Sequence, residues 1–133
     1  MLHHVVFAVA PERLDSAAAY LTDLGFRFTA FDHAELHLHI RLDWDRGFEL
    51  ISPAPGAPTH AGTAAYFLSR HGDGLFSVVV RVPDSQSSER TAERHGTAAD
   101  FRQTVTGDDT TLTEVKFEPL FGIPITVLET NLP

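Results

Sequence analysis

Two side chains, His4 and Glu49, have the types and surroundings that acid–base or metal chemistry requires. His4 lies in residues 2–9, which are rich in β-branched and aromatic residues, and Glu49 lies between Phe48 and Leu50. A carboxylate in such an apolar segment is costly unless it is paired with a cation or bound to a metal. Without a metal, burial near His4 would raise the pKa of Glu49 and would suit it to act as a general base.

Each of these residues also has a purely structural interpretation. His4 could hydrogen-bond a neighbour inside the fold, and Glu49 could form a salt bridge with Arg41 on an adjacent strand. The alternation in residues 2–9 places His4 on the face opposite Val5 and Phe7, which are expected to pack on a helix. We therefore expect His4 to point away from that helix, whether or not it binds a metal.

A further set of polar side chains alternates with aliphatic residues along residues 35–42, and its members are His37, His39 and Arg41. Two histidines two residues apart on a strand can chelate a metal, but a solvated strand face is the commoner arrangement. If instead the aliphatic face packs on the helix, these side chains would line a cavity near Glu49 and bind an anionic or oxygen-rich ligand. The sequence leaves these interpretations open.

The hydrophobic pattern predicts the elements that position these residues. Residues 2–9 read as a strand, and Pro11 and Glu12 begin a helix that ends at Gly25. Further strands are expected at 26–31, 35–42 and 48–52, with turns at 32–33 and 45–47. The Pro- and Gly-containing stretch that follows indicates a linker, with a short helix at 64–69.

The same pattern returns in the second half of the chain. Residues 75–82 repeat residues 2–9, and Ser77 aligns with His4. A helix at 85–95, capped by Asp84, and three more strands complete the repeat. A duplicated unit buries its apolar face against its twin. The sequence therefore predicts one α+β domain of two tandem βαβββ modules, with module one at 1–53, a linker at 54–73 and module two at 74–133.

Composition narrows the class of partner. The chain has 133 residues, 43% of them hydrophobic, which suffices for one domain with an ordinary core. The lack of cysteine excludes thiolate metal sites, and a formal net charge of −8 disfavours nucleic acid. No apolar run is long enough to span a bilayer. We expect a cytoplasmic protein whose partner is a small molecule.

Two βαβββ modules, with a histidine on the first strand and Phe48–Pro53 on the fourth, resemble the vicinal oxygen chelate superfamily. Its members include glyoxalase I, methylmalonyl-CoA epimerase, extradiol dioxygenases and bleomycin-resistance proteins. The resemblance implies a curled, mostly antiparallel sheet around one concave cavity. It also implies a divalent metal (Zn, Fe, Ni, Mn or Mg) held by the first and fourth strands of each module.

The metal positions implied by this resemblance fall on His4 and Glu49 in module one and on Ser77 and Thr126 in module two. A hydroxyl is a poor ligand for Zn, Fe or Ni beside an imidazole or a carboxylate. The resemblance therefore implies a reduced metal site at His4 and Glu49. It leaves Ser77 and Thr126 as contacts for a substrate.

Two functions remain open at the level of sequence. One is a glyoxalase-like lyase or isomerase in which Glu49 moves a proton. The other is a metal-free binding protein that sequesters an antibiotic or a metabolite, as bleomycin-resistance proteins do, and the loss of ligands at Ser77 and Thr126 favours it. The resemblance also implies a homodimer, in which first modules meeting across a two-fold axis could rebuild a four-ligand site.

Overall fold

The computed structural model describes residues 1–133 and divides into two compact units. The first unit is His4–Phe76, and the second unit combines Met1–His3 with Ser77–Pro133. Each unit contains a four-stranded sheet with a helix on one face, in the order β-α-β-β-β. The predicted α+β class with two βαβββ modules is confirmed. None of the helices is long and apolar enough to cross a membrane.

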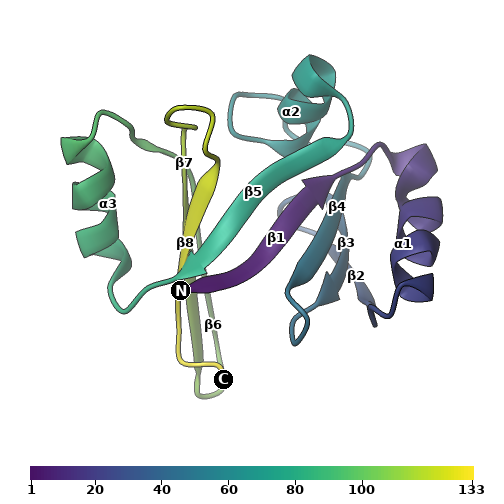
Figure 1. Cartoon of the computed structure of the whole chain (residues 1–133), viewed down its shortest axis with the longest axis horizontal. Coiled ribbons are helices and arrows are strands. Elements are labelled where there is room, and N and C mark those ends of the chain that lie inside the picture. Colours follow the sequence, from purple (N-terminus) through teal and green to yellow (C-terminus); the bar gives the residue numbers. More distant parts are fainter. The chain divides into compact units, whose positions relative to one another are not determined.

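The first unit carries seven elements in chain order. They are β1 (Leu2–Ala8, whose first two residues belong to the second unit), the short 3-10 helix η1 (Pro11–Arg13), α1 (Leu14–Asp23), β2 (Thr29–His33), β3 (Leu38–Asp43), β4 (Phe48–Pro53) and α2 (Ala64–His71). β1 pairs with β4 in parallel, and β4 with β3 and β3 with β2 are antiparallel. The strand order is therefore β2-β3-β4-β1, with α1 along the sheet (Figure 1).

The core of the first unit lies between α1 and one face of this sheet. Buried Val9, Leu14 and Leu50 form its centre. Partly buried side chains from α1, β1, β4 and the segment before β2 surround them, namely Phe7, Ala17, Ala18, Leu21, Phe28 and Phe48. The helical spacing of the α1 residues thus corresponds to one buried face. Because Phe7 and Leu50 face α1, their neighbours on β1 and β4 point to the opposite face.

The turn before β4 is held by the buried side chain of Asp43. Its carboxylate accepts hydrogen bonds from the backbone N–H of Arg27 at 2.8 Å and of Arg46 at 3.0 Å. Burial by itself would raise the pKa of Asp43, but these bonds and the Arg46 charge outweigh it, so the pKa lies below its usual value. The predicted 45–47 turn is confirmed, and it fixes the start of the strand that carries Glu49.

The second unit repeats the arrangement. Its elements are β5 (Gly74–Arg81, whose first three residues belong to the first unit), α3 (Ser85–Arg94), β6 (Ala99–Gly107), β7 (Thr110–Phe117) and β8 (Ile125–Thr130). β5 pairs with β8 in parallel, and β8-β7-β6 are antiparallel. Val115, Phe117 and Val127 pack against Ala92 of α3, which lies beside β7 and β8 (Figure 1). As predicted, Asp84 caps α3 by accepting from the N–H of Gln86 at 3.0 Å.

The structure corrects the boundaries around β2. The strand expected at 26–31 begins at Thr29 and continues through the 32–33 segment that was expected to turn. The turn lies at 34–37 instead, because the His33 ring accepts a hydrogen bond from the Leu36 N–H at 3.2 Å. His37 ends this turn with a φ of 50°. Sequence periodicity alone did not reveal this side-chain contact.

Candidate functional site

His4 and Glu49 meet on the face of the first unit that lies away from α1. Glu49 is paired in register with Val6 on β1, and His4 precedes Val6 by two residues on the same face. His4 Nε2 lies 3.8 Å from Glu49 Oε2, and the two side chains are 2% and 19% exposed. The distance is that of an ion pair and is longer than a hydrogen bond. Two ionisable groups thus share a largely buried position.

Apolar groups surround this pair within the first unit. Leu42 of β3 lies opposite Glu49, and buried Val6 and Ala8 continue the face along β1. The Trp44 ring is tilted against His4, with 6.2 Å between the ring centroids. In such surroundings a carboxylate can accept a proton, and an imidazole can donate a hydrogen bond to an oxygen that gains charge.

The side chains present do not fit a protein metal centre of the usual kind. No group of three or more His, Cys, Asp or Glu side chains lies close enough together to hold an ion. His4 and Glu49 offer two donors, whereas structural and catalytic zinc sites use three or four protein ligands.

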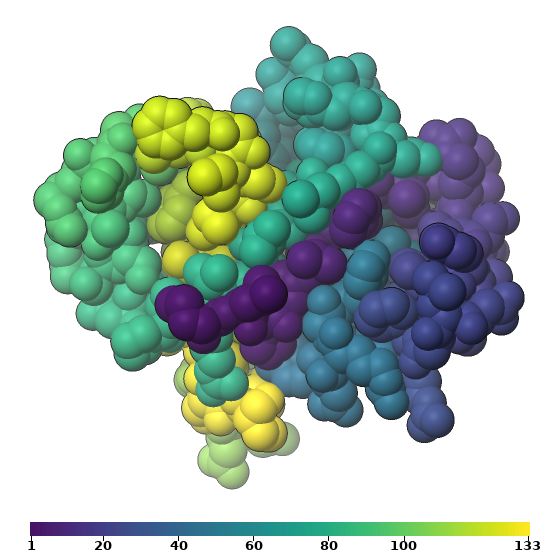
Figure 2. Space-filling model, in the orientation of Figure 1, coloured from purple at the N-terminus to yellow at the C-terminus, as the bar shows by residue number.

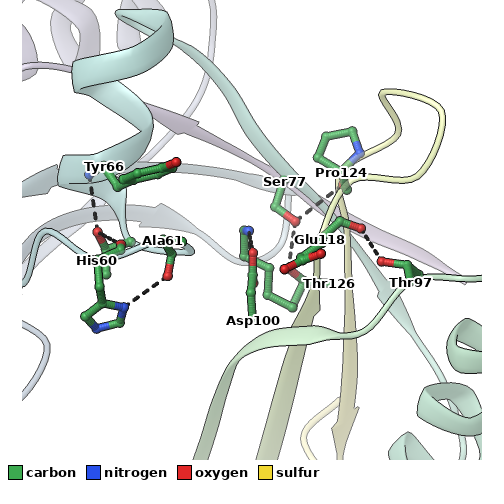
Figure 3. Close-up of polar contacts among 11 residues, drawn as sticks. His60, Ala61, Tyr66, Ser77, Thr97, Asp100, Glu118, Pro124 and Thr126 are labelled. Atoms are coloured by element: carbon green, nitrogen blue, oxygen red, sulfur yellow. Dashed lines mark hydrogen bonds and ion pairs between the residues drawn. The ribbon is translucent and has the colours of Figure 1, made fainter.

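Ser77 and Thr126 occupy the matching strand positions in the second unit. Val79 pairs in register with Thr126, which sets Ser77 and Thr126 on the face away from α3. Their hydroxyl oxygens are 2.6 Å apart, and the Ser77 hydroxyl also lies 3.4 Å from the Pro124 carbonyl oxygen (Figure 3). Both residues are buried. The two hydroxyls hydrogen-bond each other and carry no charge, whereas His4 and Glu49 are both ionisable.

The structure separates the predicted polar set from Glu49. Arg41 lies opposite Leu50, which packs on α1, and its guanidinium donates to Asp15 of α1 at 3.3 Å. His39, on the same face, contacts Asp32 with 2.7 Å between Nδ1 and Oδ1. His37 lies in the turn before β3. The prediction that these side chains line a cavity near Glu49 is wrong, because the aliphatic face of β3, and not its polar face, lies beside Glu49.

The salt bridge considered for Glu49 and Arg41 fails for the same reason. Leu42, rather than Arg41, is the register partner of Glu49. Side chains alternate along a strand, so Arg41 projects to the opposite face.

Sequence reasoning missed a group of charged side chains in the second unit. Lys116 is buried and forms an ion pair with Asp100, with 3.0 and 3.2 Å from Nζ to the two carboxylate oxygens. Glu114 lies two residues earlier on the same face of β7, and burial raises its pKa to about 7. The available signal was the alternation of Glu114 and Lys116 with Val115 and Phe117 in a predicted strand.

A groove on the other face of the second unit is apolar and contains none of the predicted site residues. Its volume is about 370 Å³. Residues of α3, β7, β8 and the loop after β7 line it, including Ala92, Phe117, Phe121 and Ile125. Figure 2 shows a hollow between the green surface of α3 and the yellow C-terminal part of this unit.

Comparison with protein families gives one match over most of the chain. A family described as a glyoxalase-like domain matches residues 2–122. No curated protein matches the sequence.

Solved structures of similar fold include two methylmalonyl-CoA epimerases. The enzyme from Mycobacterium tuberculosis has a TM-score of 0.66 and 22% identity, over 96% of this chain and 86% of that chain. A variant of the Streptomyces coelicolor enzyme, in complex with 2-nitronate-propionyl-CoA, has a TM-score of 0.65 and 14% identity, over 98% and 97%. A hypothetical protein from Bacillus halodurans C-125 has a TM-score of 0.75 and 18% identity, over 100% and 96%. At these identities the likeness shows the fold.

Proposed function

The chain belongs to the family of glyoxalase-like domains, and from this premise we propose that it is a small-molecule isomerase or lyase in which Glu49 moves a proton. The observation that carries the proposal is the buried pair of His4 and Glu49, with 3.8 Å between Nε2 and Oε2. Two adjacent groups of this kind in an apolar site are suited to proton transfer at carbon.

Each group has a separate role in this proposal. The Glu49 carboxylate accepts a proton from a carbon next to a carbonyl group, and the electrons of the broken C–H bond pass to the carbonyl oxygen. An N–H of His4 donates a hydrogen bond to that oxygen as it gains charge. Return of the proton to the opposite face of that carbon inverts its configuration and completes an isomerisation, and loss of a neighbouring group instead completes an elimination.

The proposed substrate class is an acyl thioester with an acidic C–H bond beside its carbonyl. Support comes from the epimerases of similar fold, whose names and complexes point to methylmalonyl-CoA and to a propionyl-CoA derivative. The apolar surroundings of Glu49 favour this chemistry, because a carboxylate with little hydration is a stronger base towards carbon.

A divalent metal is not required by this assignment. His4 and Glu49 are the two side chains that would contact such an ion, as the resemblance to the vicinal oxygen chelate superfamily implies, and two protein ligands hold it weakly. Homodimer formation likewise stays a prediction from that resemblance.

Exchange of the C2 proton of methylmalonyl-CoA in deuterated water tests the proposal. Mass spectrometry would follow deuterium uptake with wild-type protein, with Glu49→Gln and with the matched control Glu118→Gln, which changes an exposed glutamate. We expect wild type and Glu118→Gln to exchange deuterium faster than the protein-free solution, and Glu49→Gln to match that solution. Exchange that survives in Glu49→Gln would contradict the assignment.

A binding protein is the second candidate. It is favoured by Ser77 and Thr126, whose hydroxyls hydrogen-bond each other. These hydroxyls provide neither a base nor a strong metal ligand. Calorimetry with methylmalonyl-CoA distinguishes the candidates. Binding without deuterium exchange would support the binding protein, whereas neither binding nor exchange would reject thioesters as ligands of this chain.

A further inference from the structure

Glu114 and Gln103 lie side by side on the face of the second unit away from α3. Val115 and Phe117 pack against Ala92 of that helix, so Glu114, which directly precedes Val115 on β7, projects to the opposite face. Gln103 of β6 is its direct register partner. Side chains directly opposite each other on antiparallel strands have Cβ atoms about 5 Å apart. The carboxylate and the amide are therefore neighbours.

Both groups have hydrogen-bonding capacity that the fold leaves unused. Gln103 Oε1 is buried and accepts no hydrogen bond. Burial raises the pKa of the Glu114 carboxylate from 4.5 to about 7, and no hydrogen bond or nearby charge offsets that rise. In its ionised form the Glu114 carboxylate is an acceptor, as Gln103 Oε1 is, so the group that would satisfy both at once is a donor.

The nearby cations already have partners. Lys116, on the same face of β7, forms its ion pair with Asp100 at 3.0 Å. On β5, Arg81 donates from its guanidinium to the Thr130 carbonyl oxygen at 2.9 Å. Neither of these interactions neutralises Glu114. A ligand that brings its own positive charge would do so.

We propose that Glu114 and Gln103 bind a primary ammonium group of a small-molecule ligand. An ammonium carries three N–H donors, so it can bond the carboxylate and the amide oxygen together, whereas a hydroxyl donates only one bond. An anion would be opposed by Glu114 and would leave Gln103 Oε1 without a donor. This site uses none of the residues of the proposed proton transfer, so the two assignments stand or fall separately.

Methylammonium is the probe for this site, and tetramethylammonium is the matched comparison, because it has the same charge but no N–H. The protein would be labelled with ¹³C at the glutamate side-chain carboxyls. NMR would record the titration of Glu114 from about pH 4 to about pH 9 at constant ionic strength. The Glu114 signal is the one that disappears in Glu114→Gln, and exposed Glu118 in the same spectra is the internal control.

We expect saturating methylammonium to lower the pKa of Glu114 by about one unit, because a nearby opposite charge favours the carboxylate. Tetramethylammonium should leave the pKa of Glu114 unchanged, and both salts should leave that of Glu118 unchanged. Gln103→Leu should weaken methylammonium binding several-fold, because it removes one acceptor.

Three results would overturn the proposal. One is a pKa of Glu114 that does not respond to methylammonium. Another is an equal response to tetramethylammonium, which would show charge without hydrogen bonding. The third is a free-protein pKa close to 4.5, which would show that the carboxylate is already solvated or paired.

Discussion

Equivalent strand positions in the two modules hold chemically different pairs. The first strand and the last strand of one module bear His4 and Glu49, with 3.8 Å between nitrogen and oxygen, and those of the other bear Ser77 and Thr126, with 2.6 Å between hydroxyls. One pair can carry charge and move a proton. The other pair is neutral, and its two hydroxyls are within hydrogen-bonding distance of each other. The same strand arrangement therefore holds an ionisable pair in one module and two hydroxyls that hydrogen-bond each other in the other module.

The second module carries its ionisable groups on other strands. Glu114 and Lys116 lie on β7 and Asp100 on β6, whereas Ser77 and Thr126 lie on β5 and β8. All five belong to the sheet that α3 covers on its other face. The two modules thus share the same strand pairing, while their charged side chains lie at different positions in the sheet. Four predictions test this contrast.

The largest effect is expected at Glu49. Glu49→Gln keeps the shape but removes the base, so the deuterium-exchange rate with methylmalonyl-CoA should fall by about 100-fold to 10,000-fold. Thr126→Val, at the matching position of the other module, removes a hydroxyl that is not a base, so it should retain the turnover rate and change at most the KM. Equal losses of turnover in both variants would contradict the proposal that the pair of His4 and Glu49 is reactive and the pair of Ser77 and Thr126 is not.

The next effect concerns Glu114 and pH. Its pKa of about 7 exceeds the ordinary value of 4.5, so the folded state holds the proton more tightly, and stability falls as pH rises between these values. Glu114→Gln does not titrate. From about pH 4 to about pH 8, the unfolding free energy of Glu114→Gln relative to wild type should therefore rise by about 3 kcal/mol. Urea unfolding at both pH values measures it.

The control for this prediction is Glu118→Gln, which changes an exposed carboxylate. Its stability relative to wild type should be the same at both pH values. If Glu114→Gln behaves in the same way, the Glu114 carboxylate is solvated or paired in the folded protein.

A smaller effect is expected for the hydroxyl pair. Ser77→Ala leaves the buried Thr126 hydroxyl without its 2.6 Å partner, and Thr126→Val does the converse. Each should cost about 1–3 kcal/mol of unfolding free energy. The double variant removes both hydroxyls, so its cost should be less than the sum. Chemical unfolding of the four proteins gives the coupling energy, and additive costs would show that the hydroxyls do not stabilise each other.

The smallest effect is expected from removing metal ions. Because His4 and Glu49 provide only two protein ligands, EDTA should change the deuterium-exchange rate by less than about twofold. The measurement compares chelated protein with the same protein after Zn²⁺ or Ni²⁺ is added back. Loss of exchange on chelation, with recovery on addition of one ion, would show that the first module does bind a catalytic metal.

Strong local patterns made much of the fold predictable. The spacing of Leu14, Ala17, Ala18 and Leu21 places one helical face in the core, and the Asp84 cap marks the start of α3. The position of β2 was harder to predict from the sequence. Its turn depends on the His33 ring accepting from the Leu36 N–H, a contact that no periodic pattern encodes.

The candidate site was predictable only in part. His4 and Glu49 stood out because an ionisable residue in an apolar strand needs a partner, and the two are in fact adjacent. The error over His39 and Arg41 arose because β3 alternates cleanly. Alternation defines two faces but does not say which one packs on α1, and the register with Leu50 decides that.

The sequence by itself determined the duplicated βαβββ frame, the helix that covers each sheet and the difference in chemistry between His4 and Ser77. These follow from local spacing and from residue type. Only the tertiary structure decided that Glu49 lies near His4 and not near Arg41, and that Glu114 and Gln103 face each other. The physical reason is that strand register, set by long-range pairing, determines which side chains share a face.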